Sequence, residues 1–187
     1  NKPKLAVLVS GGGTTLQNLI DKIAEGTLAA EIVCVVSSRP DAYGVERAKD
    51  AGIPTRIVER KKFRGDAEGF CGQVNRVLDE FGPDLIVLCG FLSRLDLDPR
   101  WHMRAMNIHP ALLPCFGGKG YWGRRVHEAV IASGARFSGC TVHFVDDEYD
   151  HGPIILQAVV PVKFDDTPET LASRVFEKEC ELYPEAI

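Results

Sequence analysis

Short apolar runs alternate with helical segments through the first half of the chain, and this alternation is the strongest constraint on its fold. Continuous apolar runs of about four to eight residues are typical of strands that are buried on both faces. Strands are predicted at 4–10, 31–38, 55–59 and 84–91, with helices between them at 14–26, 42–52 and 67–82. Strand alternating with helix predicts a parallel sheet covered on both faces, which is a doubly wound α/β fold.

The pattern changes after residue 106. A helix is predicted at 126–134, and residues 140–162 read as two strands joined by a polar loop, which predicts an antiparallel or mixed region. Thr167 and Pro168 are typical of the N-cap and first position of a final amphipathic helix. The prediction is therefore a mainly parallel sheet with antiparallel strands in the C-terminal part, in a single domain over 1–187.

Composition excludes several classes of protein. Of the 187 residues, 45% are hydrophobic and the net charge is −4, which is typical of a globular protein and argues against a basic nucleic-acid binder. No apolar segment reaches the roughly 20 residues that span a bilayer, and the first residues resemble a strand rather than a signal peptide. No cysteine is part of a C-x-x-C pair, so we expect a reduced, cytoplasmic protein without a zinc site or disulfide framework.

The glycine-rich stretch VSGGGTTLQ lies between the first predicted strand and the first predicted helix. Glycines allow a ligand to approach the backbone, and a helix N-terminus offers unpaired N–H groups and a positive dipole to a phosphate. The third glycine of the dinucleotide fingerprint and the Gly-Lys-Ser/Thr of the P-loop are absent. Gly13, Thr14 and Thr15 therefore suggest a mononucleotide-type phosphate cradle. The alternative is a plain tight turn.

The stretch MNIHPALLP, residues 106–114, combines an amide and an imidazole at a predicted strand end. Residues i and i+2 of a strand point the same way, so Asn107 and His109 project together. They lie at the carboxyl end of the strand, where open α/β sheets bind ligands. Asn can donate to a developing oxyanion, and His can exchange a proton near neutral pH. The alternative is a capped strand end with a hydrogen-bonded core histidine.

The acidic turn DDEYDHGPII follows later in the chain. Asp146, Asp147 and Glu148 can be solvated surface residues, whereas a carboxylate folded over His109 would raise its pKa and orient the ring. Asp150 is the candidate, because it precedes the tight turn His-Gly-Pro. His143 and His151 could join His109 as metal ligands, but their spacing is not that of a metal site, and we expect none.

Five segments together resemble the folate-dependent formyltransferases, and specifically the phosphoribosylglycinamide formyltransferase family. They are SGGGTTLQNLI, SSRPDAYGVERAKDAGI, PDLIVLCGFL, MNIHPALLP and GCTVHFVDDEYDHGPIILQ. The resemblance runs from about Leu5 to the end of the chain. It implies a Rossmann-like formyltransferase fold and an enzyme of de novo purine synthesis. That enzyme transfers the formyl group of 10-formyltetrahydrofolate, its co-substrate, to the amine of 5-phosphoribosylglycinamide.

The resemblance also implies roles for particular residues. The catalytic residues are Asn107, His109 and Asp150. The substrate phosphate is held by Gly13, Thr14 and Thr15, and the ribose by Glu179. The folate-binding residues are Leu92, Ser93, Arg94, Leu95 and Arg64. A cis peptide is expected at Leu113–Pro114. Thr141 and His143 could hold a relaying water, or both could be structural.

Some positions depart from the family pattern. Thr15 stands where an Asn is common, Phe176 stands where some relatives have a polar residue, and residues 115–125 form a longer segment. That segment is either a surface loop with a helix start or a lid whose cations bind a second anionic group.

Three alternatives to the leading hypothesis remain at this point. They are a formyltransferase with another amine acceptor, a formyltetrahydrofolate hydrolase, and a non-catalytic nucleotide- or folate-binding protein. We expect small-molecule substrates, no nucleic-acid or membrane partner, and a monomer or homodimer.

Overall fold

The computed structural model describes residues 2–187, which form two compact units. The first unit runs to Met106, and the second is Asn107–Ile187. The strands follow the order β3-β2-β1-β4-β5-β6-β7 in a seven-stranded sheet. Strand β5, Ala105–His109, begins in the first unit and ends in the second.

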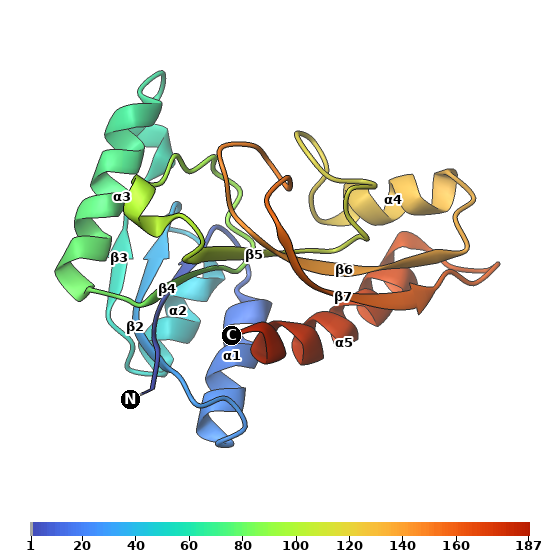
Figure 1. The fold of residues 1–187 in the computed structure, drawn as a ribbon, viewed down its shortest axis with the longest axis horizontal. Helices are drawn as coiled ribbons and strands as arrows, with labels where there is room; N and C mark the ends of the chain where they lie inside the picture. Colours follow the sequence, from blue (N-terminus) through green and yellow to red (C-terminus); the bar gives the residue numbers. More distant parts are fainter. Residues whose placement is uncertain (1) are drawn as a thin grey trace. The chain divides into compact units, whose positions relative to one another are not determined.

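Four strands build the sheet of the first unit (Figure 1). Strand β1 pairs in parallel with β2 and β4, and β2 pairs in parallel with β3. Their bounds are β1 Lys4–Val9, β2 Glu31–Ser37, β3 Thr55–Ile57 and β4 Leu85–Leu88. Leu5, Val7 and Val9 of the central strand are completely buried, as are the two residues between them. A strand with both faces buried needs apolar residues at every position, which is why β1 shows no alternation.

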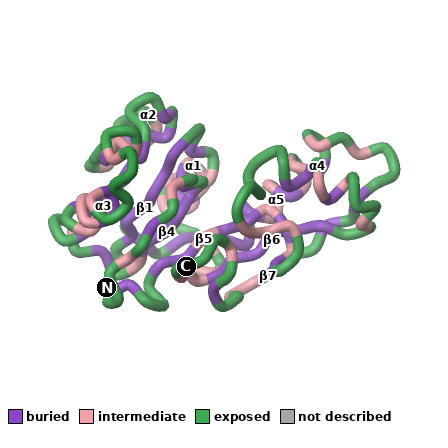
Figure 2. Tube along the Cα trace, turned by 90° about the horizontal axis from the view of Figure 1, so that it is seen from above, coloured by how far each residue is buried: buried purple, intermediate pink, exposed green. Residues whose placement is uncertain are grey.

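Three helices cover this sheet: α1 Thr14–Ala24, α2 Tyr43–Asp50 and α3 Ala67–Phe81. Helices α1 and α3 lie on opposite sides of β1 (Figures 1 and 2). Their buried side chains recur at helical spacing, with Leu16 and Leu19 on α1 and Phe70 and Val74 on α3. The first unit is thus doubly wound, as predicted.

The second unit combines a β-hairpin with two helices. Strands β6, Phe137–Phe144, and β7, Ile154–Pro161, pair in an antiparallel manner. Helix α5, Pro168–Ala186, packs against both strands and against α4, Arg124–Ala132. Thr167 caps α5 by accepting from the backbone of Thr170, and the Thr170 side chain accepts from the backbone of Thr167. The predicted N-cap is confirmed.

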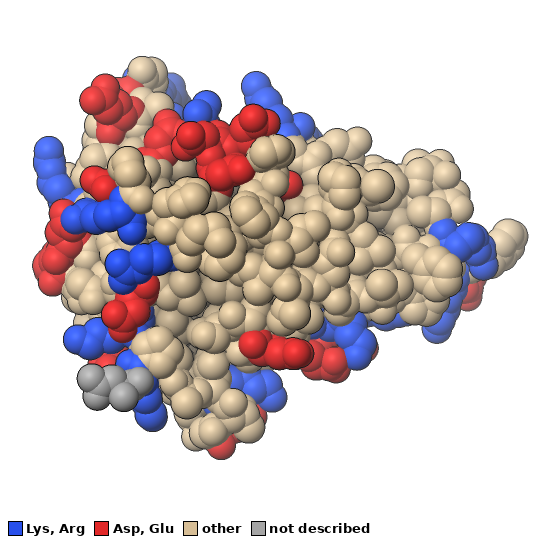
Figure 3. Space-filling model, in the orientation of Figure 1, with Lys and Arg blue, Asp and Glu red and all other residues tan. Residues whose placement is uncertain are grey.

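The exposed surface of the hairpin is poor in charge. Figure 3 shows a broad area without charged side chains over the part of the second unit that holds β6 and β7. Phe137, Ile154 and Val159 are exposed apolar residues of these strands. Within residues 2–187, none of the helices has the length and hydropathy needed to cross a membrane.

The predicted fold class is confirmed, including the change to antiparallel pairing after residue 106. Two short 3₁₀ helices, Arg60–Phe63 and Pro99–Trp101, were not predicted. Each is a single turn, too short to carry hydrophobic periodicity. The single domain over 1–187 stays a prediction.

Candidate active site

His109 ends β5 and is only 3% exposed. Its Nε2 lies 2.8 Å from the carbonyl oxygen of Phe116, and its Nδ1 lies 3.4 Å from Oδ2 of Asp150. A carbonyl only accepts, so Nε2 carries a proton in this arrangement. The Asp150 carboxylate thus faces the other ring nitrogen, Nδ1. The predicted approach of an acidic-turn carboxylate to His109 is confirmed.

The backbone conformation of Asp150 places its carboxylate beside His109. It lies in the loop between β6 and β7 with φ 54°, a left-handed conformation that non-glycine residues adopt at a cost of about 1–2 kcal/mol. The backbone N–H of Gly118 donates to Oδ2 at 3.0 Å. Phe116, whose carbonyl meets His109, also has a positive φ, of 55°. Two strained residues thus meet at one imidazole, a concentration typical of functional sites.

His143 anchors the Asn107 amide. Nδ2 of Asn107 lies 3.2 Å from Nε2 of His143, and Nδ1 of His143 lies 2.9 Å from the carbonyl oxygen of Phe144. The carbonyl requires a proton on Nδ1, so Nε2 accepts from Asn107. Burial lowers the pKa of His143, which keeps the ring neutral and preserves this tautomer. One N–H of the Asn107 amide is thereby fixed, and the second is available to a ligand.

Thr141 could hold a water or be structural, and its hydrogen bonds favour the structural alternative. Its hydroxyl donates to the Ala111 carbonyl at 2.7 Å and accepts from Leu113 N–H at 3.0 Å and from Gln157 at 2.9 Å. A hydroxyl has one donor and two acceptor positions, so all three are used. Thr141 shapes the turn that leads to the cis peptide Leu113–Pro114, which is present as expected.

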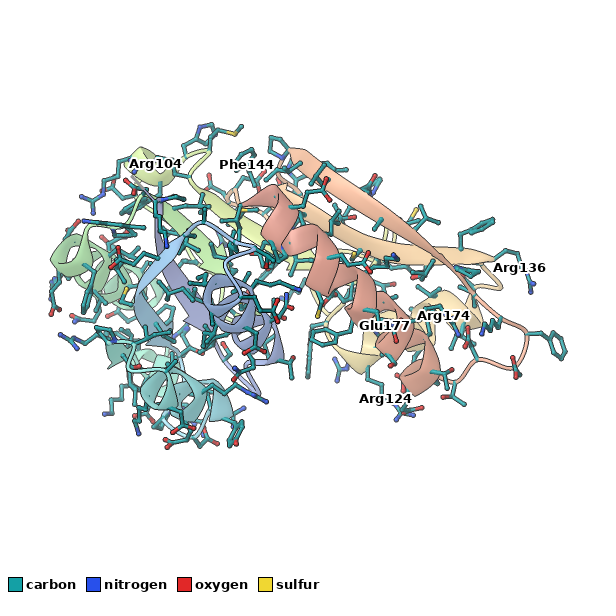
Figure 4. All side chains as sticks on the ribbon, turned by 90° about the horizontal axis from the view of Figure 1, so that it is seen from below. Arg104, Arg124, Arg136, Phe144, Arg174 and Glu177 are labelled. Carbon is teal, nitrogen blue, oxygen red and sulfur yellow. The ribbon has the colours of Figure 1, made fainter. Side chains whose placement is uncertain are left out.

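Glu179 lies on α5 and lines a cavity of about 360 Å³ within the second unit. Glu179 as a residue is 9% exposed, and burial raises the pKa of its carboxyl to about 7. Arg124, which is labelled in Figure 4, also lines this cavity. It forms ion pairs with Glu128 at 2.6 Å and with Glu169. Phe176 is part of the cavity wall.

The glycine loop of the first unit connects β1 to α1. Gly13 is the N-cap of α1 with φ 69°, and the helix has no side-chain cap. A Cβ on Gly13 would lie 2.5 Å from Cα of Gly44, so both the backbone angle and the packing require glycine there. Thr14 is exposed and Thr15 is half-buried at the first turn. The uncapped N–H groups of this turn are those that a phosphate would use.

Sequence reasoning missed Arg47, which braces this loop. Its Nε donates to the Gly12 carbonyl at 2.9 Å, its Nη1 donates to Gln17 at 3.0 Å, and the guanidinium stacks over Tyr43 at 4.9 Å. In the sequence, Arg47 is marked only by its place on a short predicted helix near Gly44. That pattern is too common to indicate a role in the glycine loop.

The proposed folate segment lies in the first unit. Leu92 is 51% exposed and its N–H donates to the Ser10 hydroxyl at 3.0 Å. Ser93 is half-buried, Arg94 is exposed and pairs with Asp96 at 3.0 Å, and Leu95 belongs to the core. The segment is thus tied to the end of β1 through Ser10.

Arg64 is exposed directly after the 3₁₀ helix Arg60–Phe63. A set of ring contacts links that helix to the start of the segment: Arg60 lies over Phe70 at 5.2 Å, and Phe70 stacks on Phe91 at 6.3 Å.

No three His, Cys, Asp or Glu side chains in residues 2–187 form a group that could hold a metal ion. His151 pairs instead with Asp146 at 2.7 Å on the surface. Residues 115–123 form an irregular segment before α4, where Arg125 lies 5.1 Å from the ring of the exposed Trp122.

Comparison with known proteins places the chain in a family. Residues 3–187 match the formyl transferase family. The chain is 46% identical over 189 residues to the trifunctional purine biosynthetic protein adenosine-3 of Gallus gallus, and 100% of the chain is covered but only 18% of that protein. It is 40% identical to the phosphoribosylglycinamide formyltransferase of Haemophilus influenzae, covering 97% of this chain and 84% of that one.

The chain spans 14–18% of the trifunctional relatives and 64% of the chloroplastic relative from Arabidopsis thaliana. The crystal structure of phosphoribosylglycinamide formyltransferase from Brucella melitensis aligns with a TM-score of 0.89 at 38% identity. That alignment covers 100% of this chain and 94% of the other. The chain therefore belongs to the formyl transferase family, among whose members it matches proteins named phosphoribosylglycinamide formyltransferase over almost its whole length.

Proposed function

We propose that the chain is a phosphoribosylglycinamide formyltransferase, which transfers the formyl group of 10-formyltetrahydrofolate to the amine of 5-phosphoribosylglycinamide in de novo purine synthesis. Family membership and the names of the relatives support this proposal. The observation that carries it is the arrangement of an anchored amide, an imidazole and a carboxylate at the end of β5.

Formyl transfer requires stabilisation of an oxyanion, transfer of a proton, and stabilisation of the group that carries the proton. The amine attacks the formyl carbon, and the carbonyl oxygen becomes an oxyanion, which the second N–H of Asn107 stabilises. The amine must lose a proton and the folate nitrogen must gain one before the carbon–nitrogen bond to folate breaks. His109 transfers that proton directly or through water, and Asp150 stabilises the imidazolium in between. Protons and electron pairs balance without a metal or redox cofactor.

The remaining assignments concern binding. Gly13, Thr14 and Thr15 would hold the substrate phosphate with N–H groups and hydroxyls at the uncapped start of α1. Glu179 would accept hydrogen bonds from the ribose. The folate would contact the segment formed by Leu92, Ser93, Arg94 and Leu95, with Arg64 supplying a positive charge.

Transfer to a different amine is the second candidate. Trp122, Arg125 and Phe176 favour it, because an exposed aromatic–cation pair and an apolar wall depart from the family pattern. We further propose a cytoplasmic enzyme that acts as a monomer or homodimer on small molecules, without nucleic-acid or membrane partners. The net charge of −4 agrees with the last point.

An assay with 10-formyltetrahydrofolate and a panel of acceptors tests the proposal. The panel contains 5-phosphoribosylglycinamide, amino sugars carried on nucleotides, and water. We expect formylated phosphoribosylglycinamide as the main product. Preferential formylation of another amine would support the second candidate. Formate release alone would indicate a hydrolase, and folate binding without turnover would indicate a binding protein.

A further inference from the structure

The Glu179 cavity contains a second buried polar residue that no assignment has used. His127, on α4, lines the same cavity and is 4% exposed. The neighbouring wall is largely apolar, formed by Pro110, Ala172 and Phe176. Arg124 is already paired with two glutamates. Glu179 and His127 are therefore the two groups of this cavity left to recognise a polar ligand.

Neither nitrogen of His127 has a hydrogen-bond partner in the part of the chain that the structure describes. Nδ1 is completely enclosed, whereas Nε2 retains some exposed surface. An enclosed N–H without an acceptor is rarer in proteins than an unsatisfied acceptor, so the proton belongs on Nε2. Burial, together with the nearby His109, lowers the pKa of His127 and keeps the ring neutral. His127 thus offers a neutral N–H donor.

Glu179 offers the complementary group. Its carboxyl is buried and has no hydrogen bond or counter-charge among residues 2–187. A carboxylate accepts from hydroxyl or amine hydrogens, and a phosphate beside it would be repelled. A cationic amine would gain nothing from the N–H of His127. One donor and one acceptor in an apolar enclosure match a hydroxyl, which accepts from the ring and donates to the carboxylate.

We infer that His127 is a specificity-determining residue, which binds a hydroxyl of the acceptor's sugar jointly with Glu179. This inference rests on the proposed function, because it assigns the cavity to the ribose of the phosphoribosyl acceptor. The apolar wall suits the carbon face of a sugar ring. A site built to hydrogen-bond a hydroxyl discriminates against analogues that lack it, because its buried polar groups are then left unpaired.

The test measures binding without turnover. Calorimetry compares ribose 5-phosphate with its 2-deoxy and 3-deoxy analogues in the wild type, His127→Phe and His127→Gln. We expect the wild type to bind one deoxy analogue about tenfold more weakly than ribose 5-phosphate. His127→Phe removes that preference, and His127→Gln, which keeps a donor, restores part of it. The exposed His102→Gln variant is the matched control and retains the wild-type preference.

Steady-state kinetics adds a second readout. His127→Phe is expected to raise KM for the acceptor about tenfold while KM for 10-formyltetrahydrofolate stays within about twofold of the wild type. The inference would be overturned if the wild type bound ribose 5-phosphate and its deoxy analogues equally well. It would also be overturned if a folded His127→Phe variant kept the full preference for ribose 5-phosphate. If His127→Phe does not fold, a His127→Gln variant with unchanged acceptor KM and sugar preference overturns it equally.

The two proposals fail separately. A wild type that transfers no formyl group but shows the expected sugar preference contradicts the proposed function and leaves the hydroxyl site in place. A wild type that formylates phosphoribosylglycinamide, with sugar preference untouched by changes at His127, contradicts this inference and leaves the function in place.

Discussion

The glycine loop of the first unit and the cluster at the end of β5 in the second unit are built in opposite ways. The loop offers backbone groups: the N–H groups at the uncapped start of α1, with Gly13 held against Gly44. The cluster consists of buried side chains, in which His143 orients Asn107 and Asp150 faces His109. A backbone site depends on chain geometry, whereas a side-chain site depends on the chemistry of individual atoms. The two should respond differently to mutation.

The largest effect is expected from removing the proton carrier. His109→Ala should lower kcat by about 10³- to 10⁴-fold, because general acid–base catalysis contributes about this much. Substrate KM values should change little, whereas the thermal midpoint should fall, because truncation leaves a cavity and an unpaired carbonyl of Phe116. Steady-state formyl transfer, with calorimetric unfolding as the control for folding, measures both. A loss below tenfold in a folded variant would mean that the proton travels elsewhere.

Removing the amide donor should cost somewhat less. Asn107→Ala is expected to lower kcat by about 10²- to 10³-fold, the usual cost of one oxyanion donor. His143→Ala leaves Asn107 present but unanchored, so we expect a smaller loss of about tenfold. The comparison of the two kcat values separates the contribution of the Asn107 hydrogen bond from the contribution of its orientation by His143. Equal losses would indicate that His143 acts on the reaction itself.

Glu179 should make stability depend on pH. Its pKa is about 7 in the folded protein against an ordinary value of 4.5. Between these values the folded state binds the proton more tightly, so the free energy of unfolding falls as pH rises. This contribution is complete below pH 4.5 and lost above pH 7. In denaturant titrations, the stability of Glu179→Gln relative to the wild type should rise by about 2–3 kcal/mol between pH 5 and pH 8. A constant difference between the proteins would contradict this.

The smallest effect concerns the loop. Gly13→Ala should reduce the free energy of unfolding by about 2 kcal/mol, since the left-handed angle and the contact with Gly44 both oppose a Cβ. Gly12→Ala is the matched control, because a Cβ there meets nothing within 4 Å and φ is not in the left-handed region. Denaturant unfolding should leave Gly12→Ala within about 0.5 kcal/mol of the wild type. Similar losses in both variants would show that the loop is less constrained than its geometry indicates.

Sequence reasoning predicted the local patterns and one long-range pair, but it missed other long-range partners. The strand runs, the Thr167 cap and the pairing of Asp150 with His109 followed from periodicity, capping chemistry and charge. The carbonyl of Phe116 against His109 could not be predicted, because it depends on a left-handed angle that phenylalanine rarely adopts. His143 could hold a water or be structural from the sequence, and its contact with Asn107 favours the structural alternative.

Arg47 and His127 were missed for a related reason. Arg47 bonds to residues distant in the sequence, and His127 lines a cavity formed by distant segments. Neither residue belongs to a motif. The catalytic and binding roles assigned to the site residues remain predictions.

A double-mutant cycle on His109 and Asp150 tests the central claim most directly, namely that the side chains at the end of β5 act as one unit in formyl transfer. Formyl transfer from 10-formyltetrahydrofolate to 5-phosphoribosylglycinamide is measured for the wild type, His109→Ala, Asp150→Ala and the double variant. We predict that the double variant loses about as much kcat as His109→Ala alone, because Asp150 acts through the imidazole. Losses that multiply fully, in variants that remain folded, would contradict the account.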